Sequence, residues 1–120
     1  KALASELKKT FSAKTIRVIG DPGLVSGKAA LSVGASGSIS QMRLLERDDV
    51  EILLAGETRE WETVEYVRDA SQAGMRKTII ILGHAISEES GMIYCAEWLK
   101  KFVGEVPVTF IPAGEPFWAP

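Results

Sequence analysis

The sequence predicts an α/β domain in which strands and helices alternate in layers around a mixed, largely parallel sheet. Short runs rich in isoleucine, leucine and valine, typical of strands, alternate with amphipathic segments from residue 28 onward. The chain has 120 residues, of which 46% are hydrophobic and 25% charged, as expected for one globular domain. We therefore expect a single α/β domain over residues 1–120.

The individual elements follow from periodicity and turn residues. Helices are expected over residues 2–11, 39–47, 59–73 and 90–103, because apolar side chains recur there at helical spacing. Strands are expected over residues 15–19, 28–33, 51–55, 77–82 and 106–111, and a proline-rich tail follows. The last helix is expected to bury six residues: Met92, Ile93, Ala96, Leu99, Phe102 and Val103. Cys95 is predicted to be a core thiol, and core or interface positions are predicted for Trp61, Trp98, Phe117 and Trp118.

Three polar features come directly after predicted strands. They are the small-residue loop 34–38, Glu57 and His84. Open α/β sheets bind ligands at the carboxyl ends of their strands, so we expect the three to share one edge of the sheet. Loops after strands are commonly polar, which gives an ordinary structural explanation for the same pattern.

His84 is the only histidine of the chain, and Glu88 follows it by four residues. Imidazole nitrogen and carboxylate oxygen suit Zn, Fe, Mn and similar divalent ions, so the pair are candidate metal ligands. The alternative is that Glu88 or Glu89 complements the positive end of the next helix while His84 merely ends a strand. Spacing alone favours this alternative, because two ligands do not complete a site.

Glu57 is a candidate catalytic residue. A carboxylate at a strand end beside a metal can bind the ion, orient a ligand or act as general base. A solvent-exposed acid in the first turn of the next helix is the alternative, and it is favoured when Glu57 is considered alone.

Composition bears on partners and location. The formal net charge is −2, which gives no indication of binding to nucleic acid or to an anionic membrane. No apolar run approaches the roughly 20 residues needed to span a bilayer. The single cysteine excludes an intrachain disulfide and favours a cytoplasmic location. The first residue is Lys, which indicates that the chain was cut from a longer protein or processed.

Several motifs stand in a distinctive order along the chain: VGASGS, LLAGE, IIILGH, SEESG, EWLKKF and VTFIP. This order resembles the C-terminal half of the GTP cyclohydrolase I type 2-like family, also called the Nif-three-like family. That family carries Gly-Glu after one strand and Gly-His-x-x-x-Glu after the next. Here the matching residues are Gly56-Glu57 and Gly83-His84 with Glu88. The resemblance covers about residues 2–117.

The resemblance implies a pair of divalent metals in a cleft between two α/β halves, and ring-like hexamers of identical subunits. It assigns His84 and Glu88 as metal ligands and places Glu57 near the metals, where it would orient water or a ligand. The family's remaining ligands, adjacent histidines and an acid, belong to the N-terminal half. Because this chain has no second histidine, the resemblance implies half a site, and an isolated chain that is inactive.

The activity implied by the resemblance is that of a metal-dependent hydrolase in which two metals activate a water molecule. The family name makes the purine ring of GTP the nominal substrate, with another nucleotide or small molecule equally open. Two alternatives remain. One is a non-enzymatic metal-binding or regulatory scaffold that works through homo-oligomeric contacts. The other is a structural interaction domain in which His84 has no chemical role.

Overall fold

A computed structural model describes residues 1–118 and contains one four-stranded sheet with the order β1-β4-β3-β2. The strands are β1 (Arg17–Ile19), β2 (Ala29–Ser32), β3 (Ile52–Ala55) and β4 (Thr78–Ile81). β2, β3 and β4 run parallel, whereas β1 pairs with β4 in the antiparallel direction. The predicted α/β class with a mixed, largely parallel sheet is confirmed.

The two central strands are buried on both faces of the sheet. Every residue of β3 and of β4 is buried. Alternate side chains enter two separate hydrophobic clusters, so that Leu54 and Ile80 face one side while Leu53 and Ile79 face the other. Continuous apolar strands of this kind are typical of a parallel sheet that helices cover on both faces.

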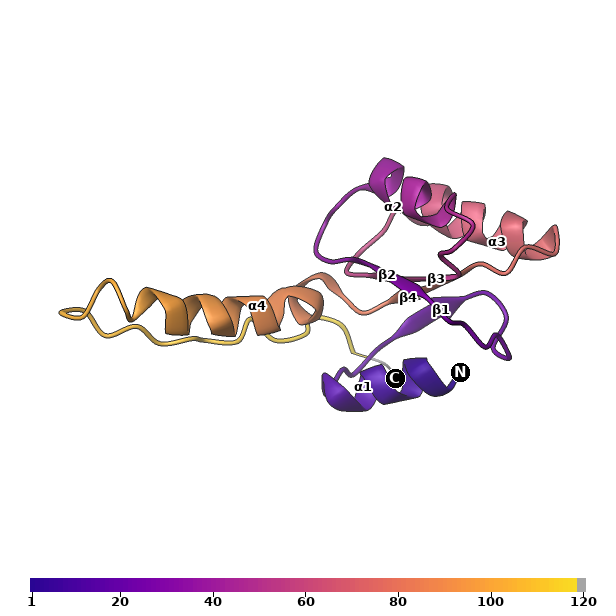
Figure 1. The fold of residues 1–120 in the computed structure, drawn as a ribbon. Helices are drawn as coiled ribbons and strands as arrows, with labels where there is room; N and C mark the ends of the chain where they lie inside the picture. The colour runs from indigo at the N-terminus through magenta and orange to yellow at the C-terminus, as the bar shows by residue number, and fades with distance from the viewer. Residues whose placement is uncertain (119–120) are drawn as a thin grey trace.

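Helices occupy both faces of this sheet (Figure 1). Helix α1 (Ala2–Thr10) lies on one face, and α2 (Ser38–Leu45) and α3 (Glu65–Gln72) lie on the other. A π-helical turn, η1 (Glu60–Val64), precedes α3, and Trp61 within it is 73% exposed, so Trp61 is not a core residue. The wider i→i+5 hydrogen bonding of a π-helix changes which residues face the sheet, and Thr63 is the buried one.

Helix α4 (His84–Leu99) begins six residues earlier than predicted and extends away from the sheet (Figure 1). Its buried residues are Ile86 and Ala96. The predicted burial of Ala96 is therefore confirmed, but the other five side chains are exposed: Met92, Ile93, Leu99, Phe102 and Val103. Cys95 is only partly buried, and Trp98 is 47% exposed, so neither is a core residue. Only the first turns of α4 meet the sheet, which leaves its apolar residues uncovered.

The predicted strand over residues 106–111 is wrong. This segment has no regular structure, and it runs back along α4 toward the end of α1 (Figure 1). A strand needs a neighbouring backbone to pair with, and a helix offers none because its own hydrogen bonds are internal. Ile111, Phe117 and Trp118 are exposed, so a core role for the two tail aromatics is also wrong. We call α4 together with residues 100–118 the arm.

The arm gives the molecule an elongated shape, with extents of 58 × 33 × 27 Å. Within the described part of the chain, no helix is both long enough and apolar enough to cross a bilayer.

Candidate metal centre

The loops that follow β2, β3 and β4 are joined side by side at the carboxyl edge of the sheet. The Glu57 N–H donates to the Gly34 carbonyl at 3.1 Å, and the Gly83 N–H donates to the Gly56 carbonyl at 2.9 Å. These bonds continue the register of the parallel strands past their ends. The three polar features that the sequence placed on one edge therefore do meet there.

Two glycines make this close approach possible. A side chain at Gly56 would place its Cβ 2.4 Å from the backbone nitrogen of Gly34 and 2.5 Å from the Ser87 Oγ. A Cβ at Gly34 would lie 2.1 Å from a carboxylate oxygen of Glu88. The glycine of the Gly-Glu motif is therefore required by packing, and the glycine after β2 leaves room for the Glu88 carboxylate.

Ser87 ties the loop after β2 to the start of α4. Its hydroxyl accepts a hydrogen bond from the Gly34 N–H at 2.9 Å and donates one to the His84 carbonyl at 2.8 Å. No motif in the sequence identifies Ser87 as part of the site. Its role follows only from the true start of α4 at His84, which places Ser87 in the first turn of the helix.

Gln41 holds the backbone of Glu57 in place through its side-chain amide. The side-chain amide of this fully buried residue of α2 donates to the Glu57 carbonyl at 2.8 Å. Its oxygen accepts hydrogen bonds from the hydroxyls of Thr58 and Thr63, at 2.7 and 3.0 Å. A buried amide with both ends hydrogen-bonded orients the chain rigidly. Sequence reasoning also missed Gln41, because a glutamine in a helix carries no recognisable signal.

His84 lies between two carboxylates. Its Nδ1 is 3.1 Å from a Glu57 oxygen, and its Nε2 is 3.1 Å from a Glu88 oxygen. Because α4 begins at His84, the histidine and Glu88 are one helical turn apart on the same face. The three side chains are each about half exposed, so the group is open to solvent.

This arrangement favours the protonated imidazole. The hydrogen bond to Glu57 is the largest influence and raises the pKa of His84 above its ordinary value of 6.5. Partial desolvation acts in the opposite direction, and the charge of Glu88 adds to the increase. A neutral ring has one N–H and one lone pair, whereas the imidazolium donates to both carboxylates.

The pair formed by Nε2 of His84 and the carboxylate of Glu88 fits a shared metal ion. Two donor atoms about 2.1 Å from one ion and at right angles to each other lie about 3.0 Å apart. The observed separation is 3.1 Å. A proton and a metal ion would therefore compete for the same position.

The two ring nitrogens point in different directions, so Glu57 cannot join His84 and Glu88 around one ion. It instead accepts the remaining N–H, a role that commonly orients a metal-ligating histidine. Within residues 1–118, no three His, Cys, Asp or Glu side chains are arranged to hold a metal ion by themselves. The donor set therefore fits part of a metal site, with two ligands and one orienting carboxylate.

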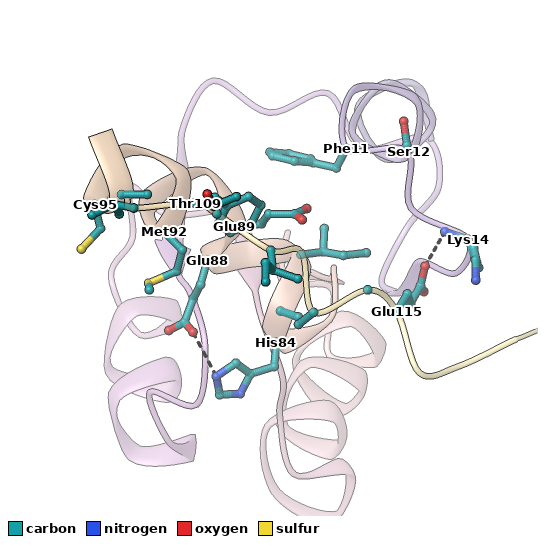
Figure 2. Close-up of a pocket in the computed structure, with 18 of the residues that line it drawn as sticks. Phe11, Ser12, Lys14, His84, Glu88, Glu89, Met92, Cys95, Thr109 and Glu115 are labelled. Atoms are coloured by element: carbon teal, nitrogen blue, oxygen red, sulfur yellow. Dashed lines mark hydrogen bonds and ion pairs between the residues drawn. The ribbon is translucent and has the colours of Figure 1, made fainter. Parts of the chain in front are cut away.

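Two pockets adjoin His84. One has a volume of about 420 Å³ and reaches Glu57 and Arg17, and the other has a volume of about 780 Å³ and lies between α4 and the returning C-terminal segment. Figure 2 shows the larger pocket, with His84 and Glu88 on one side and the Lys14–Glu115 contact on another.

Glu115 attaches the C-terminal segment, which lines both pockets, to the loop after α1. Its carboxylate accepts the backbone N–H groups of Lys14 and Thr15, at 2.6 and 3.0 Å, and the Thr15 hydroxyl. Partial burial acts to raise the pKa of Glu115, but the hydrogen bonds from Thr15 and Lys14 outweigh it and lower the pKa.

The fold and the site define an α/β domain that presents a Gly-Glu and a Gly-His-x-x-x-Glu motif side by side at the carboxyl edge of its sheet. The chain belongs to the Duf34/NIF3 (NGG1p interacting factor 3) family, whose model matches residues 1–116. No curated protein matches the chain.

Two crystal structures of the Staphylococcus aureus protein SA1388, a hypothetical protein, share the fold. Each aligns with a TM-score of 0.63 at 14% sequence identity. The alignments cover 98% of this chain but 38% and 33% of the two solved chains. The chain therefore spans little more than a third of these similar proteins.

Proposed function

We propose that this chain supplies part of a dinuclear divalent-metal site of a metal-dependent hydrolase. The observation that carries the proposal is the 3.1 Å contact between Nε2 of His84 and the Glu88 carboxylate, beside the orienting carboxylate of Glu57. Family membership supports it, since the two motifs that bring these residues together are those by which the chain resembles the family.

In this proposal His84 and Glu88 bind one metal ion, of the Zn, Fe or Mn class, and Glu57 holds the imidazole in the ligating orientation. The metal ions, when bound, supply Lewis acidity that activates water. The remaining ligands lie outside these 120 residues, in an additional half of a two-domain protein. The short aligned share of the SA1388 chains supports such an arrangement.

Metal titration of matched variants tests the ligand assignment. With the missing half of the site supplied, isothermal titration with Mn²⁺ or Zn²⁺ is expected to show binding that is lost in His84→Ala and in Glu88→Gln. Glu89→Gln is the control, because Glu89 is the next residue of α4 and has no contact with the imidazole ring. Glu57→Gln should weaken binding by about tenfold, the usual effect of removing an orienting partner. Equal affinities of Glu88→Gln and Glu89→Gln would overturn the assignment.

A second test uses the room that Gly34 leaves for Glu88. In Gly34→Ala the new methyl group would displace the Glu88 carboxylate, and metal affinity should fall. Gly37→Ala is the control, because Gly37 also has a positive φ, of 84°, but its Cβ would meet no atom within 4 Å. A loss of affinity in both variants would point to backbone strain and contradict the steric role of Gly34.

A hydrolysis assay distinguishes the proposed enzyme from the non-enzymatic scaffold. Because the proposed site is incomplete, this chain alone should not hydrolyse GTP in the presence of Mn²⁺, and hydrolysis by it would contradict the half-site. When the missing half is supplied, metal-dependent hydrolysis that is lost in Glu88→Gln would identify an enzyme. Metal binding without hydrolysis of GTP or of a substrate with an uncharged apolar body would identify the non-enzymatic scaffold.

We also propose that the protein is a cytoplasmic homo-oligomer, as the family resemblance implies. Exposed aromatic side chains on the arm, among them Tyr94, Trp98 and Phe102, support self-association, since large exposed apolar patches commonly mark interfaces. Light scattering coupled to size exclusion would show an assembly larger than a monomer. A monomer at high concentration would contradict this proposal.

A further inference from the structure

The larger pocket beside His84 has the dimensions of a ligand site. Its volume of about 780 Å³ lies within the range of roughly 300–1,000 Å³ that is usual for small-molecule sites. It is formed by α4 on one side, by the end of α1 on another, and by residues 108–115 of the C-terminal segment. The hydrogen bonds of Glu115 to the loop after α1 hold residues 108–115 in place.

The lining of this pocket is chiefly apolar. Phe11 lies across the pocket from α4, and Met92 lines its α4 side (Figure 2). Phe110 and Ile111 line it from the C-terminal segment. Such a surface gains free energy by covering an apolar ligand body, and it offers few groups that would replace the water around a strongly polar one.

The charged groups of the lining are mostly acidic. Among the described residues that form the pocket, the carboxylates are Glu88, Glu89 and Glu115, and the basic side chains are Lys14 and His84. Sites for phosphorylated ligands usually present arginine, lysine or a glycine-rich backbone nest to the phosphates. The pocket lining therefore disfavours a polyphosphate such as that of GTP, and attraction for anions would come chiefly from the metal ions.

The pocket and the candidate metal centre share two residues, His84 and Glu88. A molecule that fills the pocket therefore ends at the position where the metal would lie. We propose that the substrate of this site has an uncharged, largely apolar body, which lies in the pocket, and a polar group that reaches His84 and Glu88. This proposal rests on the proposed function, because it assigns the substrate class of that same site.

The proposal is tested by binding of N-phenyl-1-naphthylamine, a neutral apolar fluorescent molecule, to the protein. We expect its fluorescence to increase on binding, and Met92→Lys to weaken the binding by about tenfold, as the loss of one large apolar contact would. Ile93→Lys is the matched control. Ile93 is the next residue of α4 and is similarly exposed, 46% against 55% for Met92, but it does not line the pocket.

GTP is the competing ligand. It should not displace the bound fluorophore at millimolar concentration, either in EDTA or in Mn²⁺. Displacement of the fluorophore by GTP would overturn the proposal. So would equal binding by Met92→Lys and Ile93→Lys, which would show that the fluorophore binds the exposed face of α4 and not the pocket.

His84→Ala separates this proposal from the proposed function. The variant should lose metal binding and keep binding of the fluorophore, because the fluorophore is apolar and the apolar lining of the pocket is unchanged. If metal binding were unaffected by His84→Ala, the metal site would be wrong while the assignment of the pocket would stand. If only the fluorophore results failed, the metal site would stand and the substrate class would be wrong.

Discussion

The central strands and the arm use similar apolar side chains in opposite ways. Leu53 and Ile79 in the sheet have no exposed surface, whereas Trp98 and Phe102 in the arm are 47% and 66% exposed. The sheet has helices on both faces, but beyond its first turns α4 is accompanied only by the extended C-terminal segment among the residues described. An apolar sequence therefore becomes a core only where another element covers it, and the candidate site lies where the two regions join.

The largest expected effect is the difference in the free energy of unfolding between a substitution in the sheet and one in the arm. Leu53→Ala in β3 should lower the free energy of unfolding by about 2–5 kcal/mol, because it leaves a cavity in a fully buried position. Leu99→Ala in α4 should cost about 1 kcal/mol or less, because Leu99 is 37% exposed. Urea unfolding measures the difference. Equal losses would show that the arm is covered in solution.

Glycine-to-alanine substitutions should have opposite signs in the two regions. Gly56→Ala places a methyl group against the backbone of Gly34 and should lower the free energy of unfolding by about 1–3 kcal/mol. Gly91→Ala lies within α4 with no atom within 4 Å of the new methyl group, and should stabilise the helix by about 0.5–1 kcal/mol. Thermal unfolding of the two variants provides the measurement. A stable Gly56→Ala would contradict the close approach of the loops.

The candidate site, which lies where the sheet and the arm join, is tested by titrating His84. NMR of the imidazole in metal-free protein should give a midpoint above 6.5, because the hydrogen bond to Glu57 and the charge of Glu88 favour the protonated ring. Since the folded-state pKa is raised, these contacts stabilise the fold below pH 6.5, and their contribution is lost as the pH rises through the folded-state value. Glu57→Gln should lower the midpoint, and Glu89→Gln should leave it unchanged. An unchanged midpoint in Glu57→Gln would show that the contact is absent.

The smallest effect concerns the attachment of the C-terminal segment. Because the pKa of Glu115 is lowered in the folded protein, its hydrogen bonds stabilise the fold above its unfolded value of 4.5. That contribution is lost as the pH falls through the lower folded-state value. The amide signals of Lys14 and Thr15 should therefore shift at acidic pH, and Glu115→Gln should remove most of this pH dependence. If the shifts persisted in Glu115→Gln, another group would hold the segment.

Much of the sheet could be predicted because its signals are local. The runs that contain Ile52 and Ile79 are short, apolar and bounded by turn residues, so they identify buried strands without knowledge of their neighbours. The convergence of Glu57 and His84 followed from the same information, because parallel strands bring their carboxyl ends to one edge.

Where contacts with other segments decide the structure, local signals fail. The polar residues 87–91 have no apolar periodicity, so the sequence does not predict the first turns of α4 as helical. Residues 106–111 have the composition of a strand but lie along a helix, where no strand is available for pairing. The supporting roles of Gln41 and Ser87 depend on contacts 16 and 53 residues away in the chain, which no local pattern reveals.

The sequence by itself determined the α/β class, the strands of the sheet and the two short motifs that hold Glu57, His84 and Glu88, because backbone preference and alternating burial act over a few residues. The tertiary structure alone decided that His84 opens a helix, that its two nitrogens face two different carboxylates, and that an apolar pocket adjoins them. The physical reason is that these features depend on how segments far apart in the chain pack at the sheet edge, and hydrophobicity and spacing do not specify that packing.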